Sequence, residues 1–559
     1  MTGAELLIEL LLENDVDTIF GYPGGAVLPI YDALYDNPSI RHILVRHEQA
    51  AVHAADGYAR VSGKPGVSLV TSGPGATNAI TGIANGYMDS VPMVVLTGQV
   101  PTQMIGRDSF QEVDIFGMTM SITKHNFMVF HIDDLPGIIN SAFHIATTGR
   151  PGPVLIDLPK DVMTAQTGDT NTPMRSNFTT HLLDKNPCQT DIPVEQLKLI
   201  FDKLTMAKRP AVVIGGGCMA GETPKLLLQL MRKAKLPVVS TLMGLGAFPS
   251  QHPLHLGMLG MHGTVAANRT VQQADVLLCL GVRFSDRVAG NRQAFSPRSY
   301  KIQVDVEEAE LNKNIDIDLA VHGTTETVIK GLLERNLSGS WTDWNNQISH
   351  LSKRVPSLPA AENRMLQPQD VIRLVHRQSS ENAIIATDVG QHQIWTAHHY
   401  PFSQPRTFVT SGGLGTMGFG LPAAIGAAIA CPDREVVCIS GDGSIQMNIQ
   451  ELMTAVDQNL NIKVIILTNG YLGMVRQWQQ LFHKKRYSSV KISSPVFPEL
   501  AKTFGAFGYH ADNLSEAEKV IEQAWKEEGV IVMEFDITEE MNVYPMIPPG
   551  ATSAETIED

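Results

Sequence analysis

Two polar residues of this 559-residue chain follow apolar runs, at the positions where the strands of a parallel sheet would end. Asp442, between two glycines, follows the apolar run 436–439, and Asn469 follows the run 464–467. They are 27 residues apart, one strand–helix–strand step, so a right-handed crossover brings both to the same sheet edge. A carboxylate, an amide oxygen and a loop carbonyl suit Mg²⁺, which commonly keeps phosphate oxygens as further ligands. We therefore predict a metal–diphosphate site with Asp442, Asn469 and the backbone carbonyl of Tyr471 as ligands.

A second candidate is Glu48, in the stretch RHEQAA. The preceding run 43–45 is apolar and is predicted to be a buried strand, and the following residues predict a helix rich in small side chains. A carboxylate at such a junction is costly unless it has a partner. One interpretation is a salt bridge from Glu48 to Arg46 or His47, and the other is a bound ligand.

The elements that must position these residues fall into three blocks. In each block short apolar runs alternate with helix-like segments, which is typical of a doubly wound parallel sheet, and 559 residues suit about three domains. We predict an α/β fold of three doubly wound parallel-sheet domains. Ligands bind at the carboxyl edge of such sheets, where the candidate residues stand. The predicted domains are 1–163, 191–337 and 369–535, with linkers at 164–190 and 338–368 and a C-terminal tail at 536–559.

Composition narrows the class of protein. The formal net charge of −14 argues against a nucleic-acid partner or an anionic membrane surface. The five cysteines are scattered and form no CxxC pair, which predicts reduced thiols in a cytoplasmic protein. The first 16 residues lack a basic start and carry acids, so we expect a first helix rather than a signal peptide. No apolar run is long enough to predict a membrane span.

The spacing of Asp442 and Asn469 resembles the metal–diphosphate motif of thiamine diphosphate (ThDP) enzymes. That motif usually ends in two Asn, and here Thr468 fills the first position. A lone GDG is most often a simple turn, but Asn469 at this distance favours the cofactor. In the resembling family a Glu bonds the aminopyrimidine ring and promotes ionisation of the thiazolium. RHEQAA resembles the setting of that Glu, so the ligand becomes the favoured partner of Glu48.

The resemblance extends over almost the whole chain. The chain is similar to the acetohydroxyacid synthase (acetolactate synthase) family, catalytic subunit of the FAD-containing biosynthetic type. The similar stretches are GYPGGAVLPIYDAL, RHEQAA, TSGPGATN, LTGQV, DSFQEVD, TKHNF, GRPGPVLIDLPKDV, LGMLGMHGT, VRFSDRVAG, DVGQHQ, GLGTMGFGLPAAIGA, GDGS and GMVRQWQ.

The resemblance implies an activity and its partners. It implies decarboxylation of pyruvate and transfer of the hydroxyethyl unit to a second pyruvate or to 2-ketobutyrate, with ThDP, Mg²⁺ and FAD bound. The products, 2-acetolactate and 2-aceto-2-hydroxybutyrate, feed valine, leucine and isoleucine synthesis. It also implies self-association with the active site at the dimer interface, and a small regulatory subunit.

Residue roles follow from the resemblance, motif by motif. Gln391 and His392 are expected on the diphosphate, the carbonyl of Gly415 on the aminopyrimidine, and Met417 beneath the ring junction. Gly441 and Gly443 let the backbone approach the diphosphate, next to a helix N-terminus. The expected ThDP and metal positions are Val389, Gly390, Gln391, His392, Gly415, Met417, Gly441, Asp442, Gly443, Ser444, Asn469, Tyr471, Gly473 and Met474.

At the chemistry itself, the resemblance implies Glu48 as the group that drives ThDP ionisation and Gly25 as a backbone donor to the developing alkoxide. Phe110 and Gln111 are expected at the mouth of the substrate pocket, with Gln111 able to bond an intermediate. A further set is expected along the access channel and the acceptor pocket: Lys160, Met474, Val475, Arg476 and Trp478. In this family the Trp favours 2-ketobutyrate over pyruvate as the second substrate. From sequence alone Lys160 is a surface lysine, and residues 473–482 are an ordinary amphipathic helix.

The middle block supplies the expected FAD positions. Its GGG follows a predicted strand, and a tight turn alone would explain it. Asp305 ends a predicted strand, where a ribose hydroxyl could be bound. In the family pattern RFDDRVTG, this chain has Ser285 in place of the first Asp and Ala289 in place of Thr, and it retains Arg287. The expected positions are Arg150, Gly215, Gly216, Gly217, Thr241, Leu242, Met261, His262, Arg287 and Asp305.

Two other functions remain open at this point. A related ThDP enzyme, such as a pyruvate oxidase with FAD or a catabolic acetolactate synthase without it, shares the cofactor motif. GMVRQWQ and VRFSDR favour the biosynthetic synthase. A non-catalytic nucleotide-binding scaffold predicts loss of the key polar residues, but Glu48, Asp442 and Asn469 are all present.

Overall fold

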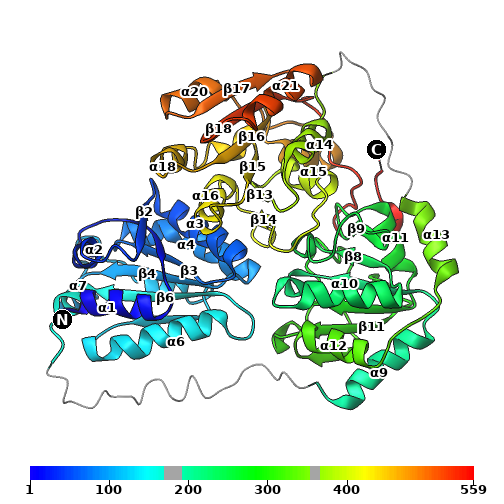
Figure 1. Ribbon diagram of the computed structural model, residues 1–559, viewed down its shortest axis with the longest axis horizontal. Helices are drawn as coiled ribbons and strands as arrows, with labels where there is room; N and C mark the ends of the chain where they lie inside the picture. Colours follow the sequence, from blue (N-terminus) through cyan, green and yellow to red (C-terminus); the bar gives the residue numbers. More distant parts are fainter. Residues whose placement is uncertain (169–191, 353–364, 559) are drawn as a thin grey trace.

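The computed structural model describes residues 1–168, 192–352 and 365–558. It contains three six-stranded sheets, and all their recorded strand pairs are parallel. Figure 1 shows one sheet in each of the three blocks, with helices covering both faces. The predicted α/β fold of three doubly wound domains is confirmed. Residues 169–190 of the predicted first linker lie outside the described residues.

The first domain begins with a helix, as expected. Thr2 and Glu5 cap α1 reciprocally, and the apolar residues of its inner face are buried. The sheet order is β2-β1-β3-β4-β6-β5. The strands are β1 (Thr18–Tyr22), β2 (Arg41–Leu44), β3 (Gly66–Val70), β4 (Met93–Gln99), β5 (His125–Met128) and β6 (Pro153–Pro159), and the helices are α1 (Gly3–Glu13), α2 (Leu28–Tyr35), α3 (Glu48–Ser62), α4 (Pro74–Asp89), α5 (Ile115–Thr119), α6 (Leu135–Thr147) and α7 (Lys160–Thr164).

The middle domain has a different order, β12-β11-β10-β7-β8-β9, in which the winding reverses between β7 and β10. Its apolar core is separate from those of the other two domains. The strands are β7 (Pro210–Ile214), β8 (Val238–Ser240), β9 (His255–Met258), β10 (Val276–Leu280), β11 (Tyr300–Asp305) and β12 (Leu319–His322), and the helices are α9 (Val194–Met206), α10 (Thr223–Ala234), α11 (Val265–Gln273), α12 (Thr325–Glu334) and α13 (Thr342–Ser352).

The third domain repeats the order of the first: β14-β13-β15-β16-β18-β17. Its central strands β15 and β16 are almost wholly buried, because helices cover both faces. The strands are β13 (Ile384–Thr387), β14 (Phe408–Thr410), β15 (Val436–Gly441), β16 (Ile462–Thr468), β17 (Phe507–Ala511) and β18 (Val530–Asp536), and the helices are α14 (Pro368–Gln378), α15 (Gln391–His399), α16 (Gly420–Ala430), α17 (Asp442–Ile445), α18 (Glu451–Asp457), α19 (Gly473–Phe482), α20 (Phe497–Thr503) and α21 (Leu514–Ala524).

The first and third domains share one apolar core along α3 and α16, which lie side by side at the centre of Figure 1. A methyl group added at Gly57 would lie 2.2 Å from the carbonyl oxygen of Ala423, and one added at Gly426 would lie 1.9 Å from that of Ala54. Backbone approach this close requires glycine at both positions. We call this contact between α3 and α16 the seam.

The structure corrects two expectations about local elements. The strand before Glu48 was predicted to be buried, but β2 lies at the edge of its sheet and Leu44 is 43% exposed. Residues 338–368 were predicted to be a linker, and 353–364 of them lie outside the described residues. The described part before residue 353 contains α13, which is joined to the middle domain because Trp341 and Trp344 insert into its core.

The described part of the C-terminal tail does not extend away from the chain. Ile547 donates its backbone N–H to the carbonyl of Met261 at 2.7 Å, and Arg269 pairs with Glu558 at 2.9 Å. The tail after β18 therefore packs on the middle domain. Within 1–168, 192–352 and 365–558, no helix has the length and apolarity needed to cross a bilayer.

Candidate active site

Asp442 and Asn469 meet at the carboxyl edge of the third sheet, as their spacing predicts. They follow β15 and β16, which are adjacent strands. Asp442 is 2% exposed and accepts backbone N–H groups of Gly443 at 3.1 Å and Gly470 at 2.8 Å. Asn469 accepts the N–H of Tyr471 at 3.1 Å through its side-chain oxygen. These bonds fix both side chains in the loops that start α17 and α19.

Burial raises the pKa of Asp442 to about 6. Its uncompensated carboxylate, the amide oxygen of Asn469 and nearby loop carbonyls form an all-oxygen donor set, which is the chemistry of a hard divalent cation. No group of three His, Cys, Asp or Glu side chains within the described ranges offers an alternative metal cluster.

The neighbouring loop after β13 leaves polar atoms without partners. Gln391 Oε1 and His392 Nε2 are buried and form no hydrogen bond among the described residues. Burial lowers the pKa of His392 to about 3, so the imidazole is neutral and can donate one N–H. Unpaired buried groups are costly and indicate a missing partner. Gln391 Oε1 and the unprotonated His392 Nε2 are both acceptors, so beside the Asp442 carboxylate they fit a cation or a ligand that supplies hydrogen-bond donors.

These residues open into one cavity of about 1720 Å³ that extends to the middle domain. A typical small-molecule pocket is about 300–1,000 Å³, so the volume suits more than one ligand or a dinucleotide. Predicted residues that line it are Arg150, Gly216, Gly217, Thr241, Leu242, Met261, His262, Arg287, Asp305, Val389, Gly390, Gln391, His392, Gly415, Met417, Gly441, Asp442, Gly443, Ser444, Asn469, Tyr471, Gly473, Met474, Val475 and Trp478.

In the middle domain the cavity lies where the strand order reverses. Gly216 faces it, but Gly215 has another reason to be glycine: a methyl group there would lie 2.0 Å from the carbonyl oxygen of Gly281. Gly215 therefore allows the loops after β7 and β10 to touch, and it does not line the cavity. Asp305 ends β11, and burial raises its pKa to about 6. His262 contributes a buried, unpartnered Nδ1.

Two arginines join the walls of this cavity. Arg150 of the first domain pairs with Glu310 of the middle domain at 2.8 Å. The guanidinium of Arg287 lies 5.7 Å from the ring centre of Trp478 on α19. The three domains thus meet around one space, and the predicted FAD and ThDP positions lie along the same cavity.

Arg476 departs from the prediction that it lines the substrate pocket. It is fully buried and donates to Gln480 Oε1 at 2.6 Å, to the carbonyl of Met541 at 2.9 Å and to Asn542 Oδ1 at 2.8 Å. On α19, Val475 and Trp478 are one turn apart and share the cavity face. Arg476 lies outside that face and instead holds the C-terminal tail against the helix.

The predicted residues of the first domain form a separate group at the edge of their own sheet. A methyl group at Gly75 would lie 3.2 Å from Glu48 Oε1, and one at Gly73 would lie 2.8 Å from Cα of Gln111. Lys160 starts α7 directly after β6. Phe110 is 87% exposed. Glu48 and Gln111 thus lie against the same glycine-rich loop before α4.

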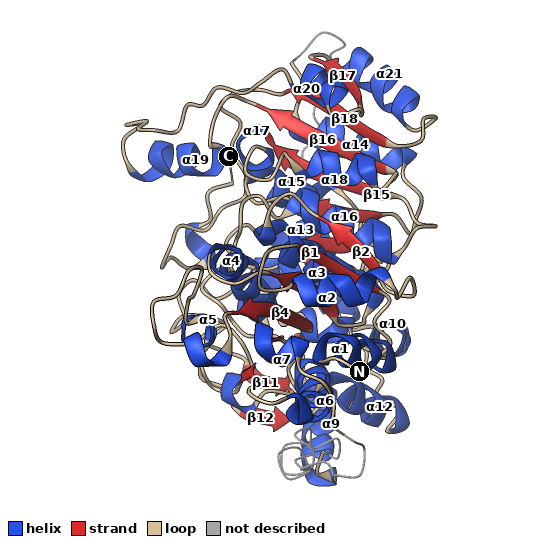
Figure 2. Cartoon of the chain, turned by 90° about the vertical axis from the view of Figure 1, so that its left-hand side faces the viewer, coloured by secondary structure: helices blue, strands red, loops and turns tan. Residues whose placement is uncertain are grey.

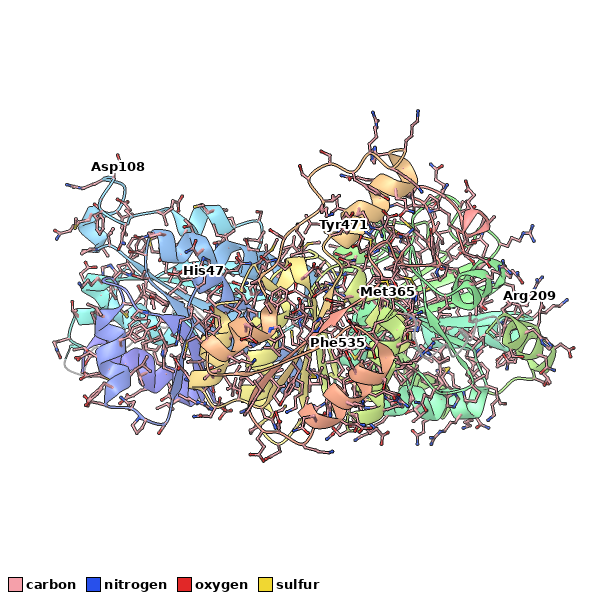
Figure 3. All side chains as sticks on the ribbon, turned by 90° about the horizontal axis from the view of Figure 1, so that it is seen from above. His47, Asp108, Arg209, Met365, Tyr471 and Phe535 are labelled. Carbon is pink, nitrogen blue, oxygen red and sulfur yellow. The ribbon has the colours of Figure 1, made fainter. Side chains whose placement is uncertain are left out.

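This first-domain edge does not line the cavity of its own chain. Glu48, Gly25, Phe110, Gln111 and Lys160 are all outside the cavity lining. In Figure 3, His47 and Tyr471 mark the two edges and lie apart, and Figure 2 shows α5 and α19 on the same side of the molecule. Within one chain the two groups of predicted residues therefore lie apart.

The structure rejects the salt-bridge interpretation of Glu48. Arg46 pairs instead with Asp457, and His47 Nδ1 caps α3 by accepting the N–H of Gln49 at 3.1 Å. The carboxylate of Glu48 accepts from Asn78 at 2.9 Å. The side chain of Glu48 is half-buried and follows β2, the edge strand of its sheet.

Sequence reasoning missed several residues that shape the cavity. Asp388 is 1% exposed, and its Oδ1 accepts the N–H groups of Val389 at 2.9 Å and Gly418 at 2.8 Å, which ties two cavity loops together. An acid directly after an apolar run, in DVGQHQ, was the signal available. Asp89 accepts the N–H groups of Gly412 and Gly413 at 3.0 and 2.7 Å, a contact between domains that no local pattern reveals.

The comparisons with known protein families agree with this division. The model "Thiamine pyrophosphate enzyme, N-terminal TPP binding domain" matches residues 1–118, and the corresponding central domain matches residues 197–332. The C-terminal TPP binding domain matches residues 388–535. Fold and matches together define the class as thiamine pyrophosphate enzymes, thiamine pyrophosphate being another name for ThDP.

Relatives along the whole chain narrow the class. The chain is 43% identical to the acetolactate synthase large subunit of Haemophilus influenzae, covering 100% of this chain and 98% of the relative. It is 43% identical to the isozyme 2 large subunit of Escherichia coli, covering 100% of both chains. The Lactococcus lactis large subunit is also 43% identical, covering 100% and 96%. The chain belongs to the family of acetolactate synthase large subunits.

Proposed function

We propose that this chain is the catalytic subunit of a biosynthetic acetolactate synthase. It would decarboxylate pyruvate and join the two-carbon unit to a second pyruvate or to 2-ketobutyrate, giving 2-acetolactate or 2-aceto-2-hydroxybutyrate for branched-chain amino acid synthesis. The observation that carries the proposal is that Asp442 and Asn469 meet at the cavity edge of the third domain, while the half-buried carboxylate of Glu48 lies on the first domain outside that cavity.

The residues at the third-domain edge fit ThDP with Mg²⁺. Asp442 and Asn469 would hold the cation with the carbonyl of Tyr471, and Gln391 and His392, which line the same part of the cavity, would lie beside the diphosphate. Gly415 has φ +74°, which a glycine adopts without strain, and lines the cavity beside Met417. Bound ThDP supplies the electron sink for decarboxylation.

FAD would occupy the middle-domain part of the cavity. The supporting features are the unpartnered Nδ1 of His262, the carboxylate of Asp305 at the end of β11, and the glycine loop after β7. Asp305 is placed where an acid at a strand end binds ribose hydroxyls in this kind of sheet.

The active site would form between two copies of the chain. Glu48 lies outside the cavity that holds Asp442, so a second copy must supply the carboxylate if both groups serve one cofactor. Phe110, with 87% of its surface exposed, and Gln111 would then lie at the mouth of the partner's pocket, with Lys160 and Gly25 on the same edge. We further propose a small regulatory subunit and a cytoplasmic location.

In this arrangement Glu48 would take and return the proton that the aminopyrimidine ring requires. The backbone N–H of Gly25 would stabilise negative charge on the substrate oxygen. Trp478 and Val475, on the cavity face of α19, would size the acceptor pocket. The buried loops of Asp388 and Asp442 would help to keep water from a bound diphosphate.

The direct test is purification with cofactor analysis, followed by acetolactate assay with pyruvate alone and with 2-ketobutyrate added. Acetolactate as the product supports the proposal, whereas acetyl phosphate or peroxide would make the chain an oxidase. The Glu48→Gln variant tests the central residue. Turnover within a few-fold of the parent at saturating ThDP would contradict the role of Glu48.

A further inference from the structure

The carboxylate of Glu48 is held at one oxygen only. Glu48 is the first residue of α3, and its Oε2 accepts from Asn78 Nδ2 on α4 at 2.9 Å. Its Oε1 lies beside Gly75, where an added methyl group would come within 3.2 Å of it. The glycine lets α4 start close to the carboxylate, and the amide of Asn78 fixes which oxygen faces inward.

The backbone that leads into Glu48 is held from the third domain. Glu451, on α18, is fully buried, and its two carboxylate oxygens lie 3.0 and 3.2 Å from the backbone nitrogen of Arg46. Thr454 donates to the same carboxylate at 2.6 Å. Asp457, one turn further along α18, pairs with the Arg46 side chain. Two residues before Glu48, the chain is thus clamped to another domain.

We infer that Asn78 and Glu451 are positioning residues for Glu48: Asn78 orients its carboxylate and Glu451 fixes the start of the helix that carries it. The inference rests on the proposed function of Glu48. Neither residue touches the cavity lining, and neither was among the residues expected at the site.

The choice of an amide partner has a chemical consequence. The amide of Asn78 is a neutral donor, so it orients the carboxylate of Glu48 without placing an opposite charge beside it. The nearby cation, Arg46, is already engaged by Asp457 and by the carbonyl of Leu44 at 2.9 Å. The surroundings therefore orient Glu48 without pairing it with a charge.

Orientation matters because a free Glu side chain must be ordered before it can act. Ordering such a side chain costs conformational entropy, and misplacing a reacting group by about 1 Å can slow a reaction roughly a hundredfold. Asn78 and Glu451 remove that cost in advance. Their loss should slow the step that Glu48 serves and leave binding of the diphosphate, on the other domain, unchanged.

The test measures exchange of the thiazolium C2 proton with solvent deuterium in the ThDP–Mg²⁺ holoenzyme, by acid quench and NMR, without substrate. We expect Asn78→Ala to slow exchange about 10- to 100-fold, with ThDP affinity and unfolding temperature close to those of the parent. Asn78→Gln should restore part of the rate. Asn140→Ala, which removes an exposed amide on α6, is the matched control and should have no effect.

Two further variants separate positioning from general damage. Asn78→Asp should move the pH profile of exchange to higher pH, because two adjacent carboxylates share a proton. Glu451→Gln keeps one acceptor for the Arg46 N–H and should slow exchange several-fold. A crystal structure of Asn78→Ala without cofactor should show the Glu48 side chain in more than one rotamer.

The outcomes distinguish this inference from the proposed function. If Glu48→Gln leaves exchange unchanged, the proposed role of Glu48 fails. If Glu48→Gln abolishes exchange while Asn78→Ala and Glu451→Gln stay within twofold of the parent, Glu48 acts alone and the positioning inference is overturned. An unchanged pH profile in Asn78→Asp would also count against it.

Discussion

The first and third domains share a strand order and a seam, but the carboxyl edges of their sheets differ in burial. The third-domain edge is buried: Asp388 and Asp442 bind backbone N–H groups of adjoining loops, and the edge lines a large cavity. The first-domain edge is open, with Glu48 half-buried and Phe110 almost fully exposed. The same strand order thus carries a buried edge in the third domain, here called the anchor, and an open edge in the first domain, here called the presenter.

The difference begins at equivalent places in the two sheets. After β13 comes Asp388, which ties its own loop to the loop of Gly418. After β1 comes Pro23, which has no N–H or polar side chain to offer, and Tyr22 is 40% exposed. Small changes at a strand end therefore decide whether an edge closes on itself or stays available to another molecule.

The largest expected effect separates anchor from presenter. Asp442→Asn should abolish Mg²⁺-dependent ThDP binding and reduce turnover by more than about a hundredfold, because the proposed cation site would lose the carboxylate of Asp442. Glu48→Gln should lose turnover and keep ThDP binding. Calorimetric titration of ThDP with and without Mg²⁺ measures both. If the two variants lose ThDP affinity equally, the division between the edges is wrong.

The seam that the two domains share can be broken directly. Gly426→Ala puts a methyl group against the carbonyl oxygen of Ala54, where there is no space, and should lower the free energy of unfolding by about 3 kcal/mol. Denaturant titration gives the value. Gly168→Ala is the control, since that exposed glycine has open space and should tolerate the change. Equal stability of the two variants would mean that α3 and α16 can separate without cost.

Asp388 gives the third domain a pH dependence that the first lacks at the equivalent position. Burial raises its pKa to about 6, so folding favours the protonated form. Its contribution to stability is therefore present below the ordinary Asp pKa and is lost as pH rises through about 6. Asp388→Asn should flatten the fall in unfolding free energy between pH 4 and 7.

The matched control for Asp388→Asn is Asp433→Asn, which removes the same charge from an exposed position. Denaturant midpoints at several pH values should follow the parent in the control and diverge from it in Asp388→Asn. Parallel curves for both variants would show that Asp388 is ionised at no cost in the folded protein.

The smallest effect on stability is expected at the open edge. Phe110→Ala should change the free energy of unfolding by less than about 0.5 kcal/mol, because the ring is already in water. Phe419→Ala, in the shared core, should cost about 3–5 kcal/mol. In the assembled enzyme Phe110→Ala should instead raise the KM for pyruvate. A large stability loss at Phe110 would mean that the edge is not open.

The sequence predicted the fold and the anchor well because both depend on local patterns. Apolar runs buried on both faces identify parallel strands, and the spacing of Asp442 and Asn469 follows from one crossover. Positions that depend on contacts between domains were missed. Glu451 holds Arg46 across about 400 residues, and Asp89 holds the loop of Gly412, so no window of sequence contains the pattern.

Some local predictions failed for a related reason. The resemblance implied that Arg476 lines the substrate pocket, but its guanidinium donates to the carbonyl of Met541 in the C-terminal tail. The strand before Glu48 is apolar and yet lies at a sheet edge. The composition of a strand does not determine its place in the sheet. The 338–368 stretch looked irregular, but two tryptophans were enough to form a helix on the middle domain.

The seam is reciprocal: Gly57 of α3 meets Ala423 of α16, while Gly426 of α16 meets Ala54 of α3. That exchange of like for like is the relation between two copies of one domain across a twofold axis. Together with the common strand order, it gives the first and third domains the form of a twofold-related pair within one chain. An ancestral domain that paired with itself through a glycine-bearing helix, and was then duplicated and fused, would leave this pattern. The helix face would be kept in both halves, while each edge remained free to acquire its own task.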